Sequence, residues 1–150
     1  PLPCQYTNLC AVCQAQLRIM KVRYPKPGIV YKGAIPVAEI ALNTSDKYLT
    51  ILISALLGNA YKFTQEGTIS LECDRLGDDR VFVAVADTGC GIPPEKHGYV
   101  FERFTKLDPF SQGNGLGLYL CRLIVTRLGG AIRVCPDYRA GCCIEITLPY

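Results

Sequence analysis

The sequence predicts an α+β fold: a two-layer α/β sandwich in which a mixed, mostly antiparallel sheet of about five strands carries about three helices on one face. Two segments of the 150-residue chain are typical of hairpins, because apolar residues alternate on either side of a short turn. Three other segments repeat apolar residues at helical spacing. The apolar content of 49% is sufficient for an ordinary core, and the length favours a single domain over residues 1–150.

The first predicted helix begins at Thr7, which we expect to be its N-cap, and ends near Lys21. A cluster of proline and glycine at residues 25–28 stops it. Residues 29–32 are then predicted as a short strand, and the segment that follows, as far as Asn43, as irregular.

The second predicted helix has the clearest pattern in the first half of the chain. Ser45 or Thr44 is expected to cap it. Its apolar residues recur at the spacing of one buried helix face: Leu49, Leu52, Ile53, Leu56, Ala60 and Phe63.

Two hairpins and a third helix are predicted in the second half. The hairpins are formed by residues 68–73 with 81–86, and by residues 131–135 with 142–148. Residues 87–117 are rich in glycine and proline, and a connection of this length inside a compact domain is usually functional or mobile. The third helix starts near Leu116 and ends at Gly129; its buried face is expected to consist of Leu120, Leu123, Ile124 and Leu128.

The composition excludes several classes of protein. A net charge of +3 with interspersed acidic residues is too small to indicate nucleic acid as a partner. No apolar run approaches the roughly 20 residues that span a bilayer, so we expect a soluble piece with no membrane contact of its own. The nine cysteines are odd in number and lie mostly in apolar stretches, which favours reduced thiols in a cytoplasmic protein. The start at Pro1 without Met suggests a longer parent, which could be anchored in a membrane.

The first segment whose residues could carry chemistry lies on the second predicted helix. Ala55, Asn59 and Lys62 are spaced i, i+4 and i+7, so they share a stripe beside the apolar one. The Asn59 amide oxygen and the Lys62 ammonium could serve a magnesium-bound phosphate chain. Taken alone, the pattern more often describes a solvated helix face.

The second segment directly follows an apolar strand and runs Asp87-Thr88-Gly89-Cys90-Gly91-Ile92-Pro93. A carboxylate at the end of a buried strand can accept a hydrogen bond from an exocyclic amine, and the glycines let a flat ring approach the backbone. In isolation, the same pattern is more often a turn.

The third segment is a glycine loop that runs into the last predicted helix, with Gly113, Gly115 and Gly117. Such a loop leaves N–H groups available, and the helix N-terminus favours an anion. The order and spacing of the three segments exclude a dinucleotide-binding βαβ unit, and the Walker A pattern is absent from the sequence.

In combination, these segments resemble the sensor histidine kinases. The similar segments are residues 53–64 (ISALLGNAYKFT, N box), 87–95 (DTGCGIPPE, G1 box), 100–104 (VFERF, F box) and 113–118 (GNGLGL, G2 box). GGAIRV and EITLP near the end also match the family's last hairpin. The resemblance covers about residues 46–149.

The resemblance implies the Bergerat ATP-binding fold, which type II topoisomerases, mismatch-repair ATPases and a class of chaperones share. By motif, Asn59 would coordinate Mg²⁺ and Lys62 would contact the phosphates of ATP. Asp87 would accept from the adenine amine, and Gly89 and Gly91 would shape the base pocket. The other nucleotide-binding or catalytic residues carried over by motif are Ile92, Arg103, Phe104, Lys106, Gly113, Gly115, Leu116 and Gly117. Of these, Arg103 and Lys106 would reach the γ-phosphate from a lid.

The function that the resemblance implies is that of a protein-histidine kinase. The chain would bind Mg·ATP and present the γ-phosphate to a histidine in a separate dimerisation module, which then serves a response regulator. It would not phosphorylate itself alone, because that module is not in this sequence. Two alternatives stay open: a degenerate nucleotide-binding scaffold, and a serine kinase of the anti-sigma-factor type.

The sequence departs from the family pattern at three places, one of which is a shorter loop between Phe104 and Gly113, so the lid is expected to close over less of the nucleotide. Ala55 stands where histidine kinases usually carry a second Asn and hydrolytic relatives a Glu, so hydrolysis through that base is excluded and weaker metal binding is expected. Cys142 and Cys143 stand where Ser or Thr is usual, so a polar contact near the base is expected to be missing. His97 is expected to be a surface loop residue.

Two further sets of residues are assigned to structure rather than to chemistry. Cys10 and Cys13 are expected to pack in the core rather than bind zinc, because no second pair follows at zinc-ribbon spacing. Phe101 is likewise expected to pack in the core, and Phe110 to lie in a mobile part.

Overall fold

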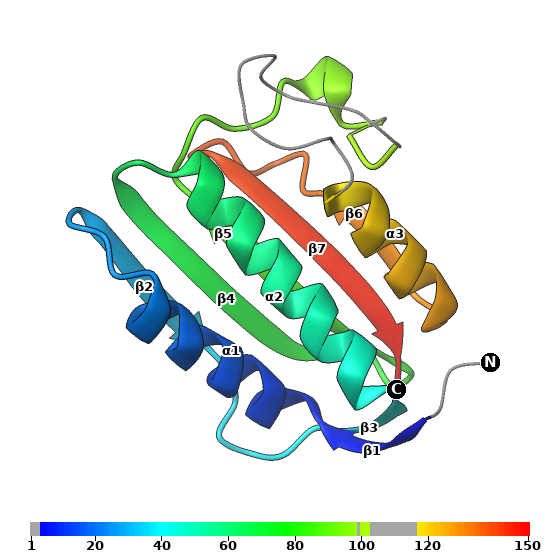
Figure 1. The fold of residues 1–150 in the computed structure, drawn as a ribbon. Helices are drawn as coiled ribbons and strands as arrows, with labels where there is room; N and C mark the ends of the chain where they lie inside the picture. Colours follow the sequence, from blue (N-terminus) through cyan, green and yellow to red (C-terminus); the bar gives the residue numbers. More distant parts are fainter. Residues whose placement is uncertain (1–3, 99, 103–116) are drawn as a thin grey trace.

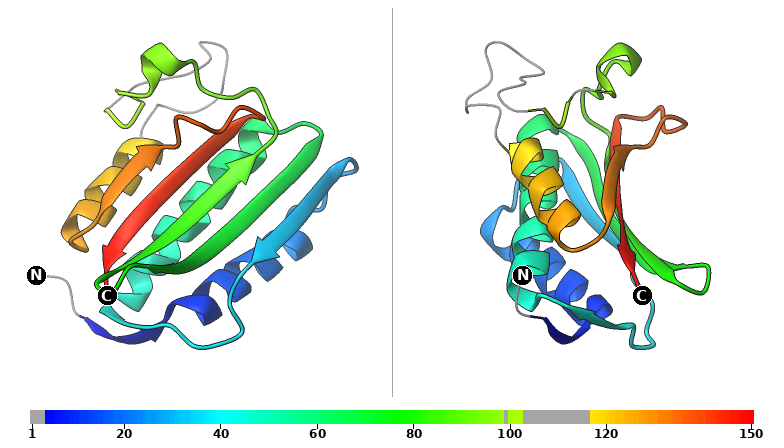
Figure 2. Two further views of the ribbon diagram at one scale, coloured as in Figure 1. Left: turned by 180° about the vertical axis from the view of Figure 1, so that it is seen from behind. Right: turned by 90° about the vertical axis from the view of Figure 1, so that its right-hand side faces the viewer.

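The computed structural model describes residues 4–98, 100–102 and 117–150. In chain order the elements are β1 (Gln5–Asn8), α1 (Leu9–Arg23), β2 (Ile29–Ala34), β3 (Ala41–Thr44), α2 (Asp46–Phe63), β4 (Gly67–Leu76), β5 (Arg80–Asp87), the short 3₁₀ helix η1 (Pro94–Lys96), α3 (Gly117–Arg127), β6 (Ala131–Val134) and β7 (Cys142–Pro149). Helices α1, α2 and α3 cover one face of the main sheet, and the other face carries no helix of the described chain (Figures 1 and 2). The predicted two-layer α+β class is therefore confirmed.

The main sheet has five strands in the order β2-β4-β5-β7-β6. Strand β2 runs parallel to β4, and every other neighbouring pair in this sheet is antiparallel. This is the mixed, mostly antiparallel sheet that was predicted. The register places Cys73 opposite Val83 and Val85 opposite Ile144, so each apolar side chain faces the helices next to another one.

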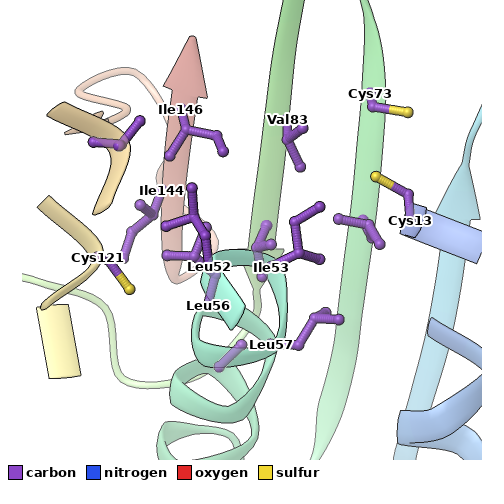
Figure 3. Packing of buried hydrophobic residues seen from close by; sticks show 14 of the residues in the cluster. Cys13, Leu52, Ile53, Leu56, Leu57, Cys73, Val83, Cys121, Ile144 and Ile146 are labelled. Atoms are coloured by element: carbon purple, nitrogen blue, oxygen red, sulfur yellow. The ribbon is translucent and has the colours of Figure 1, made fainter. Parts of the chain in front are cut away.

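Helix α2 is the centre of the helical layer. It begins where predicted, because the Ser45 hydroxyl accepts a hydrogen bond from the Tyr48 N–H at 3.3 Å. Its predicted face is buried, with Leu49, Leu52, Ile53, Leu56 and Ala60 each at most 2% exposed. Figure 3 shows this face pointing at the strands, between the side chains of β4, β5 and β7. Phe63, in the last turn, is only partly buried.

The start of the chain differs from the prediction in two ways. Thr7 belongs to strand β1, and Asn8 is the N-cap of α1. The Asn8 Oδ1 atom accepts from the N–H of Cys10 at 3.1 Å and from that of Ile40 at 3.3 Å. Strand β3 also occupies a segment that was predicted to be irregular, and it pairs with β1 in a separate two-stranded sheet. Both strands have four residues, too few for alternation to be detected.

Helix α3 buries a different face from the one predicted. The buried residues are Leu118, Cys121 and Val125, whereas Leu120 is 48% exposed. Leu123 is also exposed, and only Ile124 and Leu128 of the predicted face pack partly against the core. The sequence contains two apolar stripes on this helix, and a small thiol at position 121 made the correct stripe look weaker.

The two stripes of α3 can be separated by matched substitutions. Leu118→Ala should lower the free energy of unfolding by roughly 2 to 4 kcal/mol, because it removes a buried leucine side chain. Leu120→Ala removes the same atoms from an exposed position and should change the free energy of unfolding by about 0.5 kcal/mol or less. Urea unfolding of both variants measures the difference, and a larger loss for Leu120→Ala would mean that α3 is rotated.

Candidate functional site

Most of the described site residues gather at one end of the sandwich. Strand β5 ends there with Asp87, β7 begins there with Cys142, and α2 ends there with Phe63. Helix α3 also begins at this end, at Gly117 (Figure 1). Segments that are far apart in the sequence therefore meet at the edge where three of the four predicted boxes end or begin.

Asp87 is the most constrained polar residue of this edge. Its side chain is on the buried face of the sheet, and the residue is only 3% exposed. The carboxylate Oδ1 accepts hydrogen bonds from the N–H of Gly89 at 2.9 Å and from that of Cys142 at 3.3 Å. Burial raises the pKa of Asp87 above its usual value, and these two hydrogen bonds lower it in part. No described residue donates a hydrogen bond to the second oxygen, Oδ2, which is thus available to a ligand donor.

The loop after Asp87 requires glycine at two positions for different reasons. A Cβ atom at Gly89 would collide with the backbone carbonyl of Phe63, so the loop rests directly on the last residue of α2. Gly91 has a φ of +75°, in the left-handed region that side chains disfavour. Glycine at these two positions therefore lets the G1 loop turn and pack against the N box helix, and its expected role in shaping the base pocket stays a prediction.

Further contacts hold the same loop on its other sides. The Thr88 hydroxyl accepts a hydrogen bond from the Thr68 N–H on β4 at 2.9 Å. The Tyr138 hydroxyl, from the β6–β7 connection, donates to the backbone carbonyl of Asp87 at 3.0 Å. Ile92 is 8% exposed and belongs to the core. The carboxylate is thus presented by a loop that is anchored to β4, α2 and the β6–β7 connection.

Asn59 and Lys62 lie on α2 beside its buried face, as predicted. Asn59 is partly exposed, and Lys62 is exposed with its Nζ atom 5.3 Å from the centre of the Phe63 ring. Ala55, one turn earlier on the same stripe, packs partly against the core. The contact between Phe63 and Gly89 ties this end of α2 to the Asp87 loop.

Several predicted site residues lie outside the described residues. These are Arg103, Phe104, Lys106, Gly113, Gly115 and Leu116; Phe110, expected in a mobile part, lies outside them too. Gly117 is described and is the exposed first residue of α3. Phe101, in the F box segment, is 6% exposed, which confirms its assignment to the core.

The contacts of Cys142 and His97 add detail to the prediction. The backbone N–H of Cys142 donates to Asp87, whereas the side-chain contact expected to be missing near the base stays a prediction. His97 lies in a turn after η1 and is partly buried, and its Nε2 atom lies 2.9 Å from the carbonyl oxygen of Ile92. Tyr138 was missed altogether, since nothing in the sequence marks a turn tyrosine as a partner of Asp87.

Two properties of the described residues bear on the class of site. No group of three or more His, Cys, Asp or Glu side chains among them is arranged to hold a metal ion. No described helix is long and apolar enough to cross a membrane. The polar groups at this edge are instead a carboxylate, an amide, an ammonium and backbone N–H groups, which suit an organic ligand with an amine and a phosphate chain.

The fold and this edge together define a Bergerat-type nucleotide-binding sandwich. Residues 44–150 match the model of the family described as histidine kinase-, DNA gyrase B- and HSP90-like ATPases. The chain belongs to this family. The match includes the N box and G1 segments and the closing hairpin, so the resemblance noted in the sequence is confirmed.

Named relatives are sensor kinases. The chain is 33% identical over 153 residues to the adaptive-response sensory kinase SasA of Gloeothece citriformis, covering 99% of this chain and 39% of SasA. It is 30% identical over 139 residues to the histidine protein kinase DivJ of Caulobacter vibrioides, covering 91% of this chain and 23% of DivJ. The chain therefore spans well under half the length of these relatives.

Solved structures of histidine kinases share the fold. The mycobacterial sensor histidine kinase MprB superposes with a TM-score of 0.83 at 26% identity, covering 97% of both chains. Full-length ShkA in complex with AMPPNP gives a TM-score of 0.85 at 27% identity, covering 99% of this chain and 31% of that one. These likenesses agree with the α+β architecture and with the expected Bergerat fold.

The contact between the Asp87 loop and α2 can be tested with two glycines. Gly89→Ala should lower the free energy of unfolding by roughly 1 to 3 kcal/mol, because the methyl group meets the Phe63 carbonyl. Gly58→Ala places the same methyl group on α2, where nothing lies within 4 Å, and should stabilise by about 0.5 to 1 kcal/mol. Thermal and urea unfolding measure both, and equal effects would contradict the close approach.

The buried carboxylate predicts a dependence of stability on pH. Because the folded-state pKa of Asp87 is raised, the folded chain holds this proton more tightly than the unfolded chain between the ordinary value of 3.8 and the raised one. The stabilising contribution of Asp87 to the folded state is therefore complete below pH 3.8. It is lost as the pH rises through the raised pKa. Asp87→Asn, which never ionises, should be more stable than the unsubstituted chain at neutral pH, and this gain should shrink on acidification.

The control is Asp137→Asn, which removes an exposed carboxylate from the β6–β7 connection and should leave the stability at neutral pH nearly unchanged. Urea midpoints between pH 4 and 8 provide the measurement. A loss of stability in Asp87→Asn that is largest at neutral pH and shrinks on acidification would show instead that ionised Asp87 stabilises the fold.

Proposed function

We propose that the chain is the catalytic, ATP-binding domain of a sensor histidine kinase. It binds Mg·ATP and presents the γ-phosphate to a histidine in a separate dimerisation module, and the phosphoryl group then passes to a response regulator. The observation that carries the proposal is the buried Asp87 carboxylate, held through one oxygen and open at the other. Membership of the ATPase family supports ATP as the ligand.

A buried carboxylate of this kind suits recognition of adenine. An unpaired charge in an apolar site costs free energy, and a donor that approaches Oδ2 lowers that cost. The exocyclic amine of adenine is such a donor, and Gly89 and Gly91 are the loop residues that we propose to shape the base pocket beside it. Ile92, from the same loop, would contribute apolar surface.

The phosphate side of the proposed site is built on α2. The Asn59 amide would supply one hard oxygen ligand of the type that Mg²⁺ prefers. Lys62 adds positive charge one turn further on. Bound magnesium would neutralise charge on the phosphates. The lid residues Arg103, Phe104, Lys106, Gly113, Gly115, Leu116 and Gly117 keep the nucleotide-binding roles proposed from their motifs.

The position of Ala55 favours transfer to another molecule over hydrolysis. A methyl group there can neither activate water nor bind a metal, so the described part of α2 offers no general base one turn before Asn59. Phosphoryl transfer to an external nucleophile needs positioning and charge neutralisation instead. The relatives named sensory or histidine kinases support this direction, and a cytoplasmic location of the domain is part of the proposal.

A second candidate is a degenerate scaffold that binds ATP poorly or not at all. Ala55 favours it as well, because a usual polar ligand is replaced by a side chain that packs against the core. The two candidates differ in what the chain does with Mg·ATP. The kinase must bind it and must phosphorylate a histidine that is supplied from outside.

Calorimetric titration with ATP and Mg²⁺ tests the proposed base pocket. The unsubstituted chain should bind ATP, and Asp87→Asn should bind it more weakly by roughly 1 to 3 kcal/mol, because an amide donor would face the adenine amine. The matched variant Asp137→Asn, exposed in the β6–β7 connection, should bind like the unsubstituted chain.

Three outcomes separate the candidates. Equal affinity of Asp87→Asn and the unsubstituted chain would remove Asp87 from the base pocket. Failure of the unsubstituted chain to bind ATP would favour the scaffold. Normal ATP binding without phosphotransfer to an added histidine-bearing dimerisation module of a related kinase would also favour the scaffold, whereas transfer would support the kinase.

A further inference from the structure

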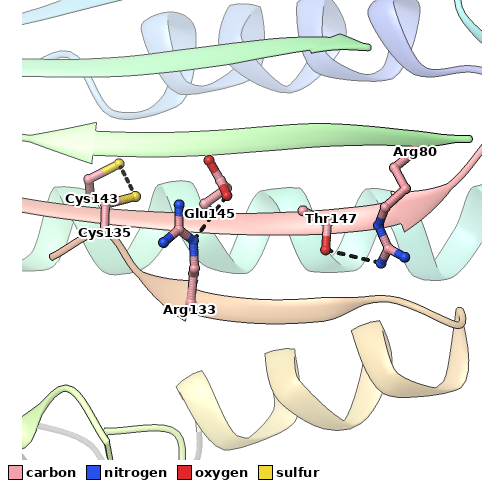
Figure 4. A network of polar contacts seen from close by, with 6 residues as sticks. All are labelled: Arg80, Arg133, Cys135, Cys143, Glu145 and Thr147. Atoms are coloured by element: carbon pink, nitrogen blue, oxygen red, sulfur yellow. Dashed lines mark hydrogen bonds and ion pairs between the residues drawn. The ribbon is translucent and has the colours of Figure 1, made fainter. Parts of the chain in front are cut away.

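Two cysteines face each other on the side of the sheet that carries no described helix. Cys135 follows β6 directly, and Cys143 is the second residue of β7. Their Sγ atoms are hydrogen-bonded at 3.0 Å (Figure 4). We propose that Cys135 and Cys143 form a redox-reactive dithiol, which a hydroperoxide oxidises to a disulfide between the two strands. The proposal does not depend on nucleotide binding, although the cavity beside the pair is also lined by Gly89, Gly91 and Ile92 of the Asp87 loop.

The backbone already has a geometry that a disulfide can bridge. The register of β6 and β7 places Val134 opposite Ile144, and the next pair along is Cys135 and Cys143. The Cys135 N–H donates to the Cys143 carbonyl at 2.8 Å, so the antiparallel ladder continues to this pair. Opposite residues of such a ladder have Cα atoms about 4.5 to 5.5 Å apart, within the range of about 4.4 to 6.8 Å found for disulfides.

The pair lies on the open face of the sheet rather than in the core. Side chains alternate along β7, and Cys143 shares its side with Glu145 and Thr147. Arg133, on the β6 side, forms an ion pair with Glu145 at 3.1 Å on that same face (Figure 4). Cys142 instead points into the core. Cross-linking can therefore occur without opening the helical layer, unlike any reaction of the buried Cys13.

A cavity gives small molecules access to the pair. It has a volume of about 290 Å³ and is lined by Cys135 and Cys143 together with Cys90, His97 and Tyr138. A water molecule occupies about 30 Å³, so a small hydroperoxide has room to enter. A metal ion is the less suitable occupant, because no three His, Cys, Asp or Glu side chains of the described residues are arranged to hold one.

The two thiols are not equivalent. The contact between the two thiols lowers the pKa of Cys135 and raises the pKa of Cys143. Cys135 is also the partly exposed member, whereas Cys143 is buried. Cys135 is therefore the thiol that attacks the oxidant, and Cys143 the one that resolves the product.

The chemistry balances with one hydroperoxide. The Cys135 thiolate attacks one peroxide oxygen, the O–O bond breaks, and the leaving oxygen takes up a proton as an alcohol, or as water when the oxidant is hydrogen peroxide. The resulting sulfenic acid is attacked by the Cys143 sulfur; the S–S bond forms, the S–O bond breaks, and hydroxide leaves with the Cys143 proton as water. Two electrons pass from the two sulfur atoms to the peroxide.

Peptide mapping tests the proposal on the 150-residue chain. The reduced chain is treated with one equivalent of hydrogen peroxide, and the remaining thiols are blocked with N-ethylmaleimide. Trypsin cleaves after Arg133 and Arg139, which separates Cys135 (residues 134–139) from Cys143 (residues 140–150). We expect these two peptides to be joined, at a mass two hydrogen atoms below their sum, and to separate on reduction.

Substitutions assign the sulfur atoms. Cys135→Ser and Cys143→Ser should each abolish the joined peptide, and Cys90→Ser, which changes another thiol of the same cavity, should keep it. If Cys143→Ser does not fold, Cys135→Ser alone tests whether the bridge involves this pair. Fragmentation of the joined peptide then shows whether its second sulfur atom is that of Cys143 or that of Cys142. Separate peptides that both carry the blocking group, or a bridge to Cys90 or Cys142, would overturn the proposal.

Discussion

The buried carboxylate of Asp87 is the interaction on which the proposed site depends. Its burial disfavours the charge, and the N–H groups of Gly89 and Cys142 offset only part of that cost through one oxygen. The sheet makes this arrangement possible, because the register of β5 and β7 sets Asp87 opposite Cys142. A ligand that donates a hydrogen bond to the other oxygen, Oδ2, would supply the partner that the described residues do not provide. Selective recognition of an amine and a modest loss of stability therefore have the same cause.

The loop that presents this carboxylate also connects the two halves of the proposed site. Because Gly89 rests on the last carbonyl of α2, the distance between the base-reading loop and the helix of Asn59 and Lys62 is fixed by a backbone contact. Helix α2 in turn buries six side chains in the core. The proposed adenine side and the proposed phosphate side would thus be positioned by packed elements, as catalysis by positioning and charge neutralisation requires.

Much of the architecture could be predicted because its signals are local and repeated. Helix α2 has six buried positions at helical spacing and a serine cap, and the two hairpins alternate over several residues. The face of α3 could not be chosen, since Leu118 and Leu120 belong to competing stripes and only packing against α2 and β6 decides between them. The roles of Tyr138 and of the Cys135–Cys143 pair depend on strand register, which a single sequence does not reveal. Asp87 and its glycines were found by motif, but their contacts with Phe63 and Cys142 required the fold.

The most direct test of the central claim is the affinity of the chain for ATP relative to inosine triphosphate, in which a carbonyl replaces the exocyclic amine. If Oδ2 of Asp87 receives that amine, ATP should bind more tightly by roughly 1 to 3 kcal/mol, or about 5- to 150-fold. In Asp87→Asn this preference should shrink or reverse, because the new amide can donate to the carbonyl. Equal affinity for the two nucleotides, or a preference that survives the substitution unchanged, would contradict the account.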